Sequence, residues 1–163
     1  MIQSDAVLSE IKINGVTHVI GVVDNGSRVL YQKLWDDPDI HLIPVTREGE
    51  AFSLAAGIYL GGEKPMVLIQ NTGFFESGDA FRGTVVNMAV PLVMIIGYRG
   101  YETMSGAGSV DTAAKYFEPI LKAWEITYYT LRSPEDICLI SRAFSESENT
   151  SRPVAVIYAG EMD

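Results

Sequence analysis

The stretch REGEAFSLAAGIYLGGEKPMVLIQNTG, residues 47–73, indicates the fold most clearly because it combines one helix, one buried strand and one polar turn. Residues 47–61 carry a helical pattern, and the glycine pair at 61–62 is typical of a helix end. Residues 65–70 are apolar almost throughout, as expected for a strand of a parallel sheet that helices cover on both faces. The polar stretch 71–78 follows that strand, so we expect a loop there.

The same alternation of strand and helix runs along the rest of the chain. Further strands are predicted at 17–23, 40–45, 91–97, 126–131 and 152–159. Further helices are predicted at 3–13, 27–36, 76–89, 113–123 and 133–147. The pattern predicts an α/β fold: a doubly wound, mostly parallel six-stranded sheet with helices on both faces. We expect residues 1–163 to form a single domain.

Composition excludes several classes of function. The chain of 163 residues has 21 acidic and 12 basic residues and a net charge of -9, which argues against a nucleic-acid partner. No apolar stretch is long enough to span a bilayer, and the N-terminus lacks the pattern of a signal peptide, so we expect a cytoplasmic protein without a membrane partner. Cys138 is the only cysteine, which excludes an internal disulfide. Because Cys138 lies in the apolar run DICLI, we expect a buried structural thiol.

Several common kinds of site are absent from the sequence. It contains no GxGxxG motif, no Walker phosphate loop and no GxSxG nucleophile elbow. His18 and His41 each stand at a strand start without metal-ligand spacing, so no metal site is expected in this chain. We interpret His18 as a strand residue near the edge of the sheet. Any chemistry must therefore use carboxylates and amides, with or without a cofactor, unless the chain is not an enzyme on its own.

Ligands of doubly wound folds bind beyond the carboxyl ends of the strands. That rule selects the loops DNGS, TRE, NTGFFESG, YRGYETMSGAGSVD and RS, at residues 24–27, 46–48, 71–78, 98–111 and 132–133. The segment 98–111 is long and rich in Gly and Ser, and we interpret it as either a lid or an ordinary flexible loop.

Glu48 and Glu50 both lie in the first turn of the helix 47–61, where either acid would complement the helix dipole. Glu48 shares its helical face with Ala51, Phe52, Ala55 and Tyr59, an apolar stripe. Glu50 shares its face with Ser53, Leu54, Gly57 and Gly61, so it is expected to point outward. Burying a carboxylate costs free energy unless it has a partner, so the pattern favours Glu48 as the functional acid.

The segments GVTHVIGVVDNG (15–26), 47–73 and VPLVMIIGYRG (90–100) resemble the pyrimidine-binding (PYR) domain of thiamine-diphosphate enzymes. The resemblance is greatest to the 2-oxoacid decarboxylase branch with the sulfopyruvate and phosphonopyruvate decarboxylases. It implies that Glu48 activates the cofactor through a hydrogen bond to N1′ of the aminopyrimidine. It implies a thiamine diphosphate site that includes Asn71, Thr72 and Gly73.

The resemblance also implies contacts with a 2-oxoacid substrate. They would come from Asp24, Gln70 and Arg99, the last through an anionic tail such as a sulfonate or phosphonate. Simpler interpretations stay open: Asp24 and the 70–72 stretch as turn formers, and Arg99 as a solvated loop residue.

The chain departs from the family pattern at two places. GFFES (73–77) replaces a GLGN-like turn, which substitutes Phe74, Phe75 and Glu76 for a small residue and an amide. The loop beyond Arg99 lacks a histidine that is frequent in that branch. Both departures leave the substrate open and admit a bulkier or more apolar 2-oxoacid.

The chain also lacks the GDG motif with which a second domain holds Mg²⁺ and the diphosphate. The resemblance therefore implies an alpha subunit of a 2-oxoacid decarboxylase that needs a PP-domain beta subunit to hold both, and a homo-oligomer formed through the PYR domain. We expect the apolar segment 79–97 to supply a subunit-pairing surface. The alternatives are a non-catalytic PYR-fold binding module and a likeness of architecture alone.

Overall fold

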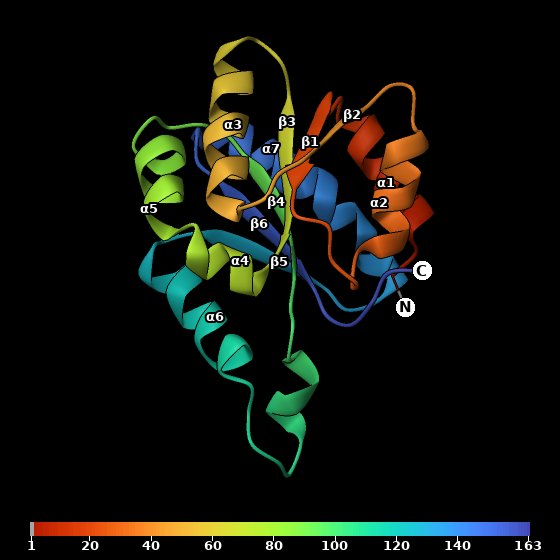
Figure 1. The fold of residues 1–163 in the computed structure, drawn as a ribbon, viewed down its shortest axis with the longest axis vertical. Coiled ribbons are helices and arrows are strands. Elements are labelled where there is room, and N and C mark those ends of the chain that lie inside the picture. The colour runs from red at the N-terminus through yellow and green to blue at the C-terminus, as the bar shows by residue number, and fades with distance from the viewer. Residues whose placement is uncertain (1) are drawn as a thin grey trace.

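The computed structural model describes residues 2–163, which form a six-stranded parallel sheet with helices on both faces (Figure 1). The strands are β1 His18–Gly21, β2 His41–Pro44, β3 Pro65–Gln70, β4 Val93–Gly97, β5 Thr127–Leu131 and β6 Val154–Tyr158. The α-helices are α1 Ser4–Ile13, α2 Arg28–Asp36, α3 Glu48–Leu60, α4 Asn71–Glu76, α5 Gly78–Ala80, α6 Thr112–Ala123 and α7 Leu139–Thr150. The predicted fold class is confirmed.

The strand order is β2-β1-β3-β4-β6-β5. The chain therefore leaves β1 in one direction, to β2, and returns past β1 to continue with β3 and β4 on the other side. This reversal of direction between β1 and β3 is the topological switch point at which doubly wound folds form a crevice. Because all the strands are parallel, the loops after β1, β2, β3 and β4 meet at one edge of the sheet.

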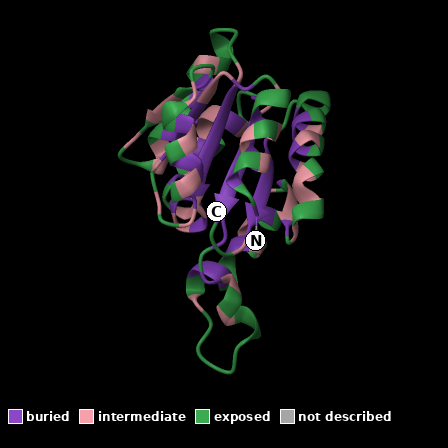
Figure 2. Ribbon diagram, turned by 90° about the vertical axis from the view of Figure 1, so that its right-hand side faces the viewer, coloured by how far each residue is buried: buried purple, intermediate pink, exposed green. Residues whose placement is uncertain are grey.

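Each strand contributes alternate side chains to two separate cores, which is why the strands are apolar on nearly every residue. On one face, Val19, Leu68 and Ile95 pack with α1, α2 and α7. On the other face, Ile20 and Ile69 pack with α3, α4 and α6. Figure 2 shows the buried strands between half-exposed helices.

The second core is dominated by aromatic side chains. Phe74 of α4 contacts Phe52, Phe81, Phe117 and Trp124 at ring-centroid distances between 5.2 and 6.3 Å. Phe81 stacks on Trp124 with an interplanar angle of 9°. Phe81 begins a π-helical turn, Phe81–Val86, that continues from α5. These contacts join α3, α4, α6 and the π-helical turn into one layer, so α4 has a fixed position relative to α3.

The helix predicted at 76–89 and the loop predicted at 71–78 are both corrected. The chain turns directly into α4 at Asn71 and then breaks at Ser77 before α5 and the π-helical turn. The reason is the pair Phe74 and Phe81, both of which are fully buried in the aromatic core. Tertiary burial thus sets the helix boundaries here, in place of local propensity.

Two expectations about exposure are wrong. Cys138 is exposed because it ends the 3-10 turn Pro134–Cys138, ahead of the face of α7 that Ile140 and Phe144 bury. The apolar residues of 79–97 lie mostly inside the chain's own core, since β4 is a central strand with every residue buried. The exposed residues of that segment are mostly polar or small: Asp79, Arg82, Asn87, Met88 and Ala89. Among residues 2–163, no helix is both long and apolar enough to cross a membrane.

We predict that Phe81→Ala lowers the free energy of unfolding by about 3–5 kcal/mol, because a buried ring leaves a cavity between Trp124 and Phe52. Urea denaturation followed by circular dichroism measures the change. Trp35→Ala is the matched control, since Trp35 is 68% exposed and its loss should change stability by less than about 0.5 kcal/mol. Equal effects of the two substitutions would contradict the assignment of the aromatic core.

Candidate active site

Glu48 is the first residue of α3 and lies at the carboxyl edge of the sheet. The stripe predicted below it is largely confirmed: Ala51, Phe52 and Ala55 are fully buried. Tyr59 is the exception at 39% exposure, because the buried face continues through Ala56 instead. The α3 residues predicted to share the face of Glu50 are all exposed, and so is Glu50.

The side chain of Glu48 lies directly against the backbone of Gly73 in α4. A Cβ at Gly73 would come within 2.3 Å of the Cγ and 2.4 Å of the Oε1 of Glu48. Both distances are far shorter than van der Waals contact, so a side chain at this position would displace Glu48. Within residues 2–163, the Glu48 carboxylate has no ion pair and accepts no hydrogen bond. The glycine of the NTG turn therefore makes room for an unpaired, half-buried carboxylate.

Glu50 caps the helix, as the sequence suggested. Its Oε2 accepts hydrogen bonds from the backbone N–H groups of Thr46 and Arg47, both at 3.2 Å, and from the Thr46 hydroxyl at 3.1 Å. The Thr46 bonds, followed by the Arg47 N–H, lower the pKa of the Glu50 carboxyl below its usual value. The two acids of the first turn thus differ: the Glu50 carboxylate accepts three hydrogen bonds, and the Glu48 carboxylate accepts none among residues 2–163.

Glu76, the last residue of α4, holds the first turn of α3 from the opposite side. Its carboxylate bonds the Arg47 guanidinium and accepts the Gly49 N–H at 3.1 Å. The Arg47 bond, and then the Gly49 bond, lower the pKa of Glu76. Sequence reasoning had noted Glu76 only as a departure from the family pattern.

Asp24 and Gln70 are brought together at the switch point between β1 and β3. Asp24 Oδ1 accepts from the Gly26 N–H (2.6 Å), the Ser27 N–H (3.2 Å) and the Gln70 amide (3.0 Å). Its Oδ2 accepts from the Ser27 hydroxyl at 2.6 Å. Asp24 therefore braces its own loop and fixes the Gln70 amide, so that the Gln70 oxygen points away from Asp24.

Asn71 is fully buried, and its side-chain amide connects two distant backbone carbonyls. Its Nδ2 donates to Arg99 O and Ala113 O, both at 3.1 Å, while its Oδ1 accepts from the Thr72 N–H at 3.0 Å. These bonds tie both ends of the loop 98–111 to the start of α4. The loop itself extends away from the rest of the molecule (Figure 1). It contains the 3-10 turn Tyr101–Ser105.

Arg99 is exposed, and its guanidinium lies 3.8 Å from Asp111 in a loose ion pair. Thr72 stands beside an apolar groove of about 540 Å³ between α4 and α6. The groove is lined by Thr72, Phe75, Thr112, Ala113, Tyr116 and Ile120. Phe75, one of the unexpected aromatic residues, therefore lines the groove next to Thr72.

Sequence reasoning missed two tyrosines, Tyr31 and Tyr158, near the carboxyl ends of the strands. The Tyr31 hydroxyl of α2 donates to Leu68 O at 2.7 Å, with Val22 O also within reach at 3.1 Å. Burial, and then the charges of Asp24 and Glu48, raise the pKa of Tyr31. The Tyr158 hydroxyl of β6 is buried, and a Cβ at Gly97 would lie 3.0 Å from it. The only sequence signal was the presence of hydroxyl-bearing rings in apolar runs, since such rings need space or partners when buried.

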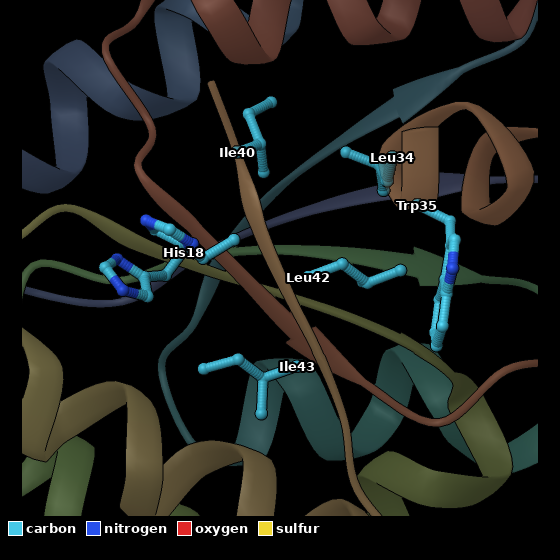
Figure 3. A pocket seen from close by; sticks show the side chains of 7 residues that line it. His18, Leu34, Trp35, Ile40, Leu42 and Ile43 are labelled. Carbon is cyan, nitrogen blue, oxygen red and sulfur yellow. The ribbon is translucent and has the colours of Figure 1, made fainter. Parts of the chain in front are cut away.

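A separate hollow of about 470 Å³ lies beside β2, the strand at one side of the sheet (Figure 3). His18 and His41 are register partners at the starts of β1 and β2, with ring centroids 5.0 Å apart. His18 accordingly lies next to the edge strand, as interpreted from the sequence. In the described part of the chain, no group of three or more His, Cys, Asp and Glu side chains could hold a metal ion.

A comparison with solved structures identifies the fold. The chain superposes on a thiamine diphosphate-dependent 4-hydroxybenzoylformate decarboxylase from Rhodococcus jostii RHA1 with a TM-score of 0.74 and 19% identity. The match covers 99% of this chain and 31% of that one. The fold is that of the pyrimidine-binding domain of thiamine-diphosphate enzymes.

Sequence comparison gives the family within this class. The chain is 32% identical to the sulfopyruvate decarboxylase subunit alpha of Methanococcus maripaludis, over 94% of this chain and 92% of that protein. It is 30% identical to the sulfopyruvate decarboxylase subunit alpha of Methanocaldococcus jannaschii, over 94% of this chain and 90% of that protein. A scan of the sequence against protein families found no match. The chain belongs to the family of sulfopyruvate decarboxylase alpha subunits.

We predict that Gly73→Ala lowers the free energy of unfolding by about 1–3 kcal/mol, because the new methyl group overlaps the Glu48 side chain. Gly57→Ala in α3 is the control: a Cβ there meets nothing within 4 Å, so we expect about 0.5–1 kcal/mol of stabilisation. Urea denaturation of both variants measures the difference. Adding Glu48→Ala to Gly73→Ala should restore stability; an unchanged deficit would show that the strain arises elsewhere.

We predict that the lowered pKa values of Glu50 and Glu76 make the first turn of α3 sensitive to acid. A carboxyl group with a lowered pKa stabilises the fold above its unfolded value of 4.5, and this stabilisation is lost as the pH falls through the folded pKa. Urea denaturation from about pH 7 to about pH 3 should thus show a smaller loss of stability in Glu76→Gln than in the natural protein. Glu63→Gln is the control, since the Glu63 side chain is exposed and makes no hydrogen bond among residues 2–163. An equal loss of stability in the natural protein, Glu76→Gln and Glu63→Gln would contradict the prediction.

Proposed function

We propose that the chain is the alpha subunit of a thiamine-diphosphate-dependent 2-oxoacid decarboxylase that acts on sulfopyruvate. The observation that carries the proposal is the unpaired Glu48 carboxylate, which Gly73 accommodates at the carboxyl edge of the sheet. Family membership supports the same activity, because the relatives bear the name sulfopyruvate decarboxylase.

The residues present fit the aminopyrimidine end of thiamine diphosphate. Gly73 leaves room for the Glu48 side chain, and Glu48 provides a carboxylate whose oxygens are not used within the described chain. In the proposal Glu48 shares a proton with N1′ of the pyrimidine, and Thr72 and Gly73 line its edge. Asn71 contributes by holding the turn in place, since its own amide is fully bonded. When bound, the cofactor supplies the electron sink for the loss of CO₂ from a 2-oxoacid.

The substrate contacts of the proposal start from Gln70 and Arg99. Asp24 holds the Gln70 amide nitrogen, which leaves the Gln70 oxygen as a fixed acceptor at the switch point. The Arg99 guanidinium suits a sulfonate, and its ion pair with Asp111 at 3.8 Å is loose enough to exchange for a substrate anion. Asp24 then acts on the substrate through Gln70.

The proposed assembly includes a PP-domain beta subunit that holds Mg²⁺ and the diphosphate, with residues 1–163 as a single PYR-type domain. A homo-oligomer formed through that domain, and a cytoplasmic location, belong to the same proposal. The name subunit alpha of the relatives supports a multi-subunit enzyme.

We predict that Glu48→Gln lowers the rate of CO₂ release from sulfopyruvate by roughly 100- to 10,000-fold, the contribution expected of a positioned proton-transfer group. The measurement uses the chain co-expressed with a PP-domain protein from a neighbouring reading frame, with thiamine diphosphate and Mg²⁺ added. Glu50→Gln is the matched control and should retain most of the activity, because Glu50 only caps α3.

Full activity of Glu48→Gln in an active pair would refute the role of Glu48. If no PP-domain partner gives activity and the chain never binds the cofactor, the chain is a non-catalytic module of the same fold.

A further inference from the structure

One face of α4 contacts the first turn of α3 at two successive positions. Gly73 receives the Glu48 side chain, and Glu76, three residues later, bonds Arg47 and the Gly49 N–H. Side chains three residues apart on a helix have Cβ atoms about 5–6 Å from each other. The Arg47 guanidinium and the Glu48 side chain therefore both lie against the same face of α4.

Arg47 is the nearest cation to Glu48 in sequence, yet it bonds Glu76. Its Nε–H donates to Glu76 Oε1 at 3.0 Å, and a terminal guanidinium nitrogen donates to the same oxygen. The Arg47 side chain is 72% exposed, so packing does not prevent it from rotating toward another acid. The hydrogen bonds to Glu76 first, and then the charges of Glu76, Glu50 and Glu48, raise the pKa of Arg47. Arg47 thus lies within electrostatic reach of Glu48.

An ion pair between Arg47 and Glu48 would oppose the proposed role of Glu48. A carboxylate beside a guanidinium favours its charged form and gives up its lone pairs to the fork of N–H donors. Such a carboxylate is a poor partner for a proton shared with a pyrimidine nitrogen. In the structure, Glu76 is the acid that binds Arg47.

We propose that Glu76 is a positioning residue that sequesters the Arg47 guanidinium and so keeps the Glu48 carboxylate unpaired for the cofactor. This inference rests on the proposed function of Glu48. It differs from a purely structural role, in which Glu76 would only cap the Gly49 N–H at the start of α3. Removing Arg47 relieves competition for Glu48 but cannot replace a lost helix cap, so the two roles are separable by experiment.

The test compares Glu76→Gln, Arg47→Gln and the double variant in the complex with the PP-domain subunit. The hydrogen at C2 of bound thiamine diphosphate is exchanged for deuterium and followed by proton NMR after quenching. We expect Glu76→Gln to slow this exchange by roughly ten- to 100-fold, a part of the factor that a positioned acid–base group contributes. The double variant should regain most of the lost rate. Asp79→Asn, which breaks the neighbouring exposed pair with Arg82, is the control and should leave the rate unchanged.

A second measurement needs no cofactor and uses the full chain alone. The NMR signal of the Arg47 Nε–H reports its protection from solvent by a carboxylate partner. In Glu76→Gln we expect the signal to stay protected through Glu48, and to lose protection when Glu48→Gln is added. In the natural protein, Glu48→Gln should leave the signal unchanged because Glu76 is the partner.

Three outcomes would overturn the inference. The first is a C2 exchange rate that Glu76→Gln does not change. The second is a double variant whose C2 exchange is as slow as in Glu76→Gln. The third is an Arg47 Nε–H signal in Glu76→Gln whose protection does not change when Glu48→Gln is added. The second outcome assigns Glu76 to helix capping alone. Failure of the proposed function is recognised separately, because Glu48→Gln would then leave the C2 exchange rate at its natural value.

Discussion

The parallel pairing of β1 with β3 is the constraint from which the candidate site follows. The two strands are in register from His18 with Pro65 to Gly21 with Leu68, but the chain leaves them toward opposite sides of the sheet. Their following segments therefore diverge and leave a crevice at the carboxyl edge. Asp24 and Gln70 meet across this crevice, and the start of α3 comes to lie against the start of α4. Without that reversal, Glu48 and Gly73 would belong to different parts of the molecule.

The fold was predictable because its determinants are local and repetitive. Each strand has an apolar run, and alternate residues of these runs enter two cores, so the pattern is visible without knowledge of contacts. The distinction between Glu48 and Glu50 was predictable for the same reason, since helical spacing alone separates the buried and exposed faces of α3.

What could not be predicted depends on contacts between distant residues. Asn71 starts a helix because Phe74 and Phe81 join an aromatic core, and the local sequence NTGFFES does not by itself predict that helix. The saturation of Asp24 depends on Gln70, which lies 46 residues away. The hydrogen bond that Arg47 donates to Glu76 spans 29 residues. The exposure of Cys138 depends on the orientation of a single 3-10 turn, although its neighbours are apolar. The roles of Glu48 and of the other site residues remain predictions to be tested.

The Asn71 amide has a consequence for how this architecture can diversify. By bonding Arg99 O and Ala113 O, it fixes both feet of the loop 98–111 on a buried point of the scaffold. The entropy of closing a loop grows only slowly with its length once the ends are fixed. Changes between residues 101 and 110 are thus insulated from the turn that carries Gly73 and its contact with Glu48. The scaffold thus lets the sequence and length of this loop change while the contact between Glu48 and Gly73 stays in place.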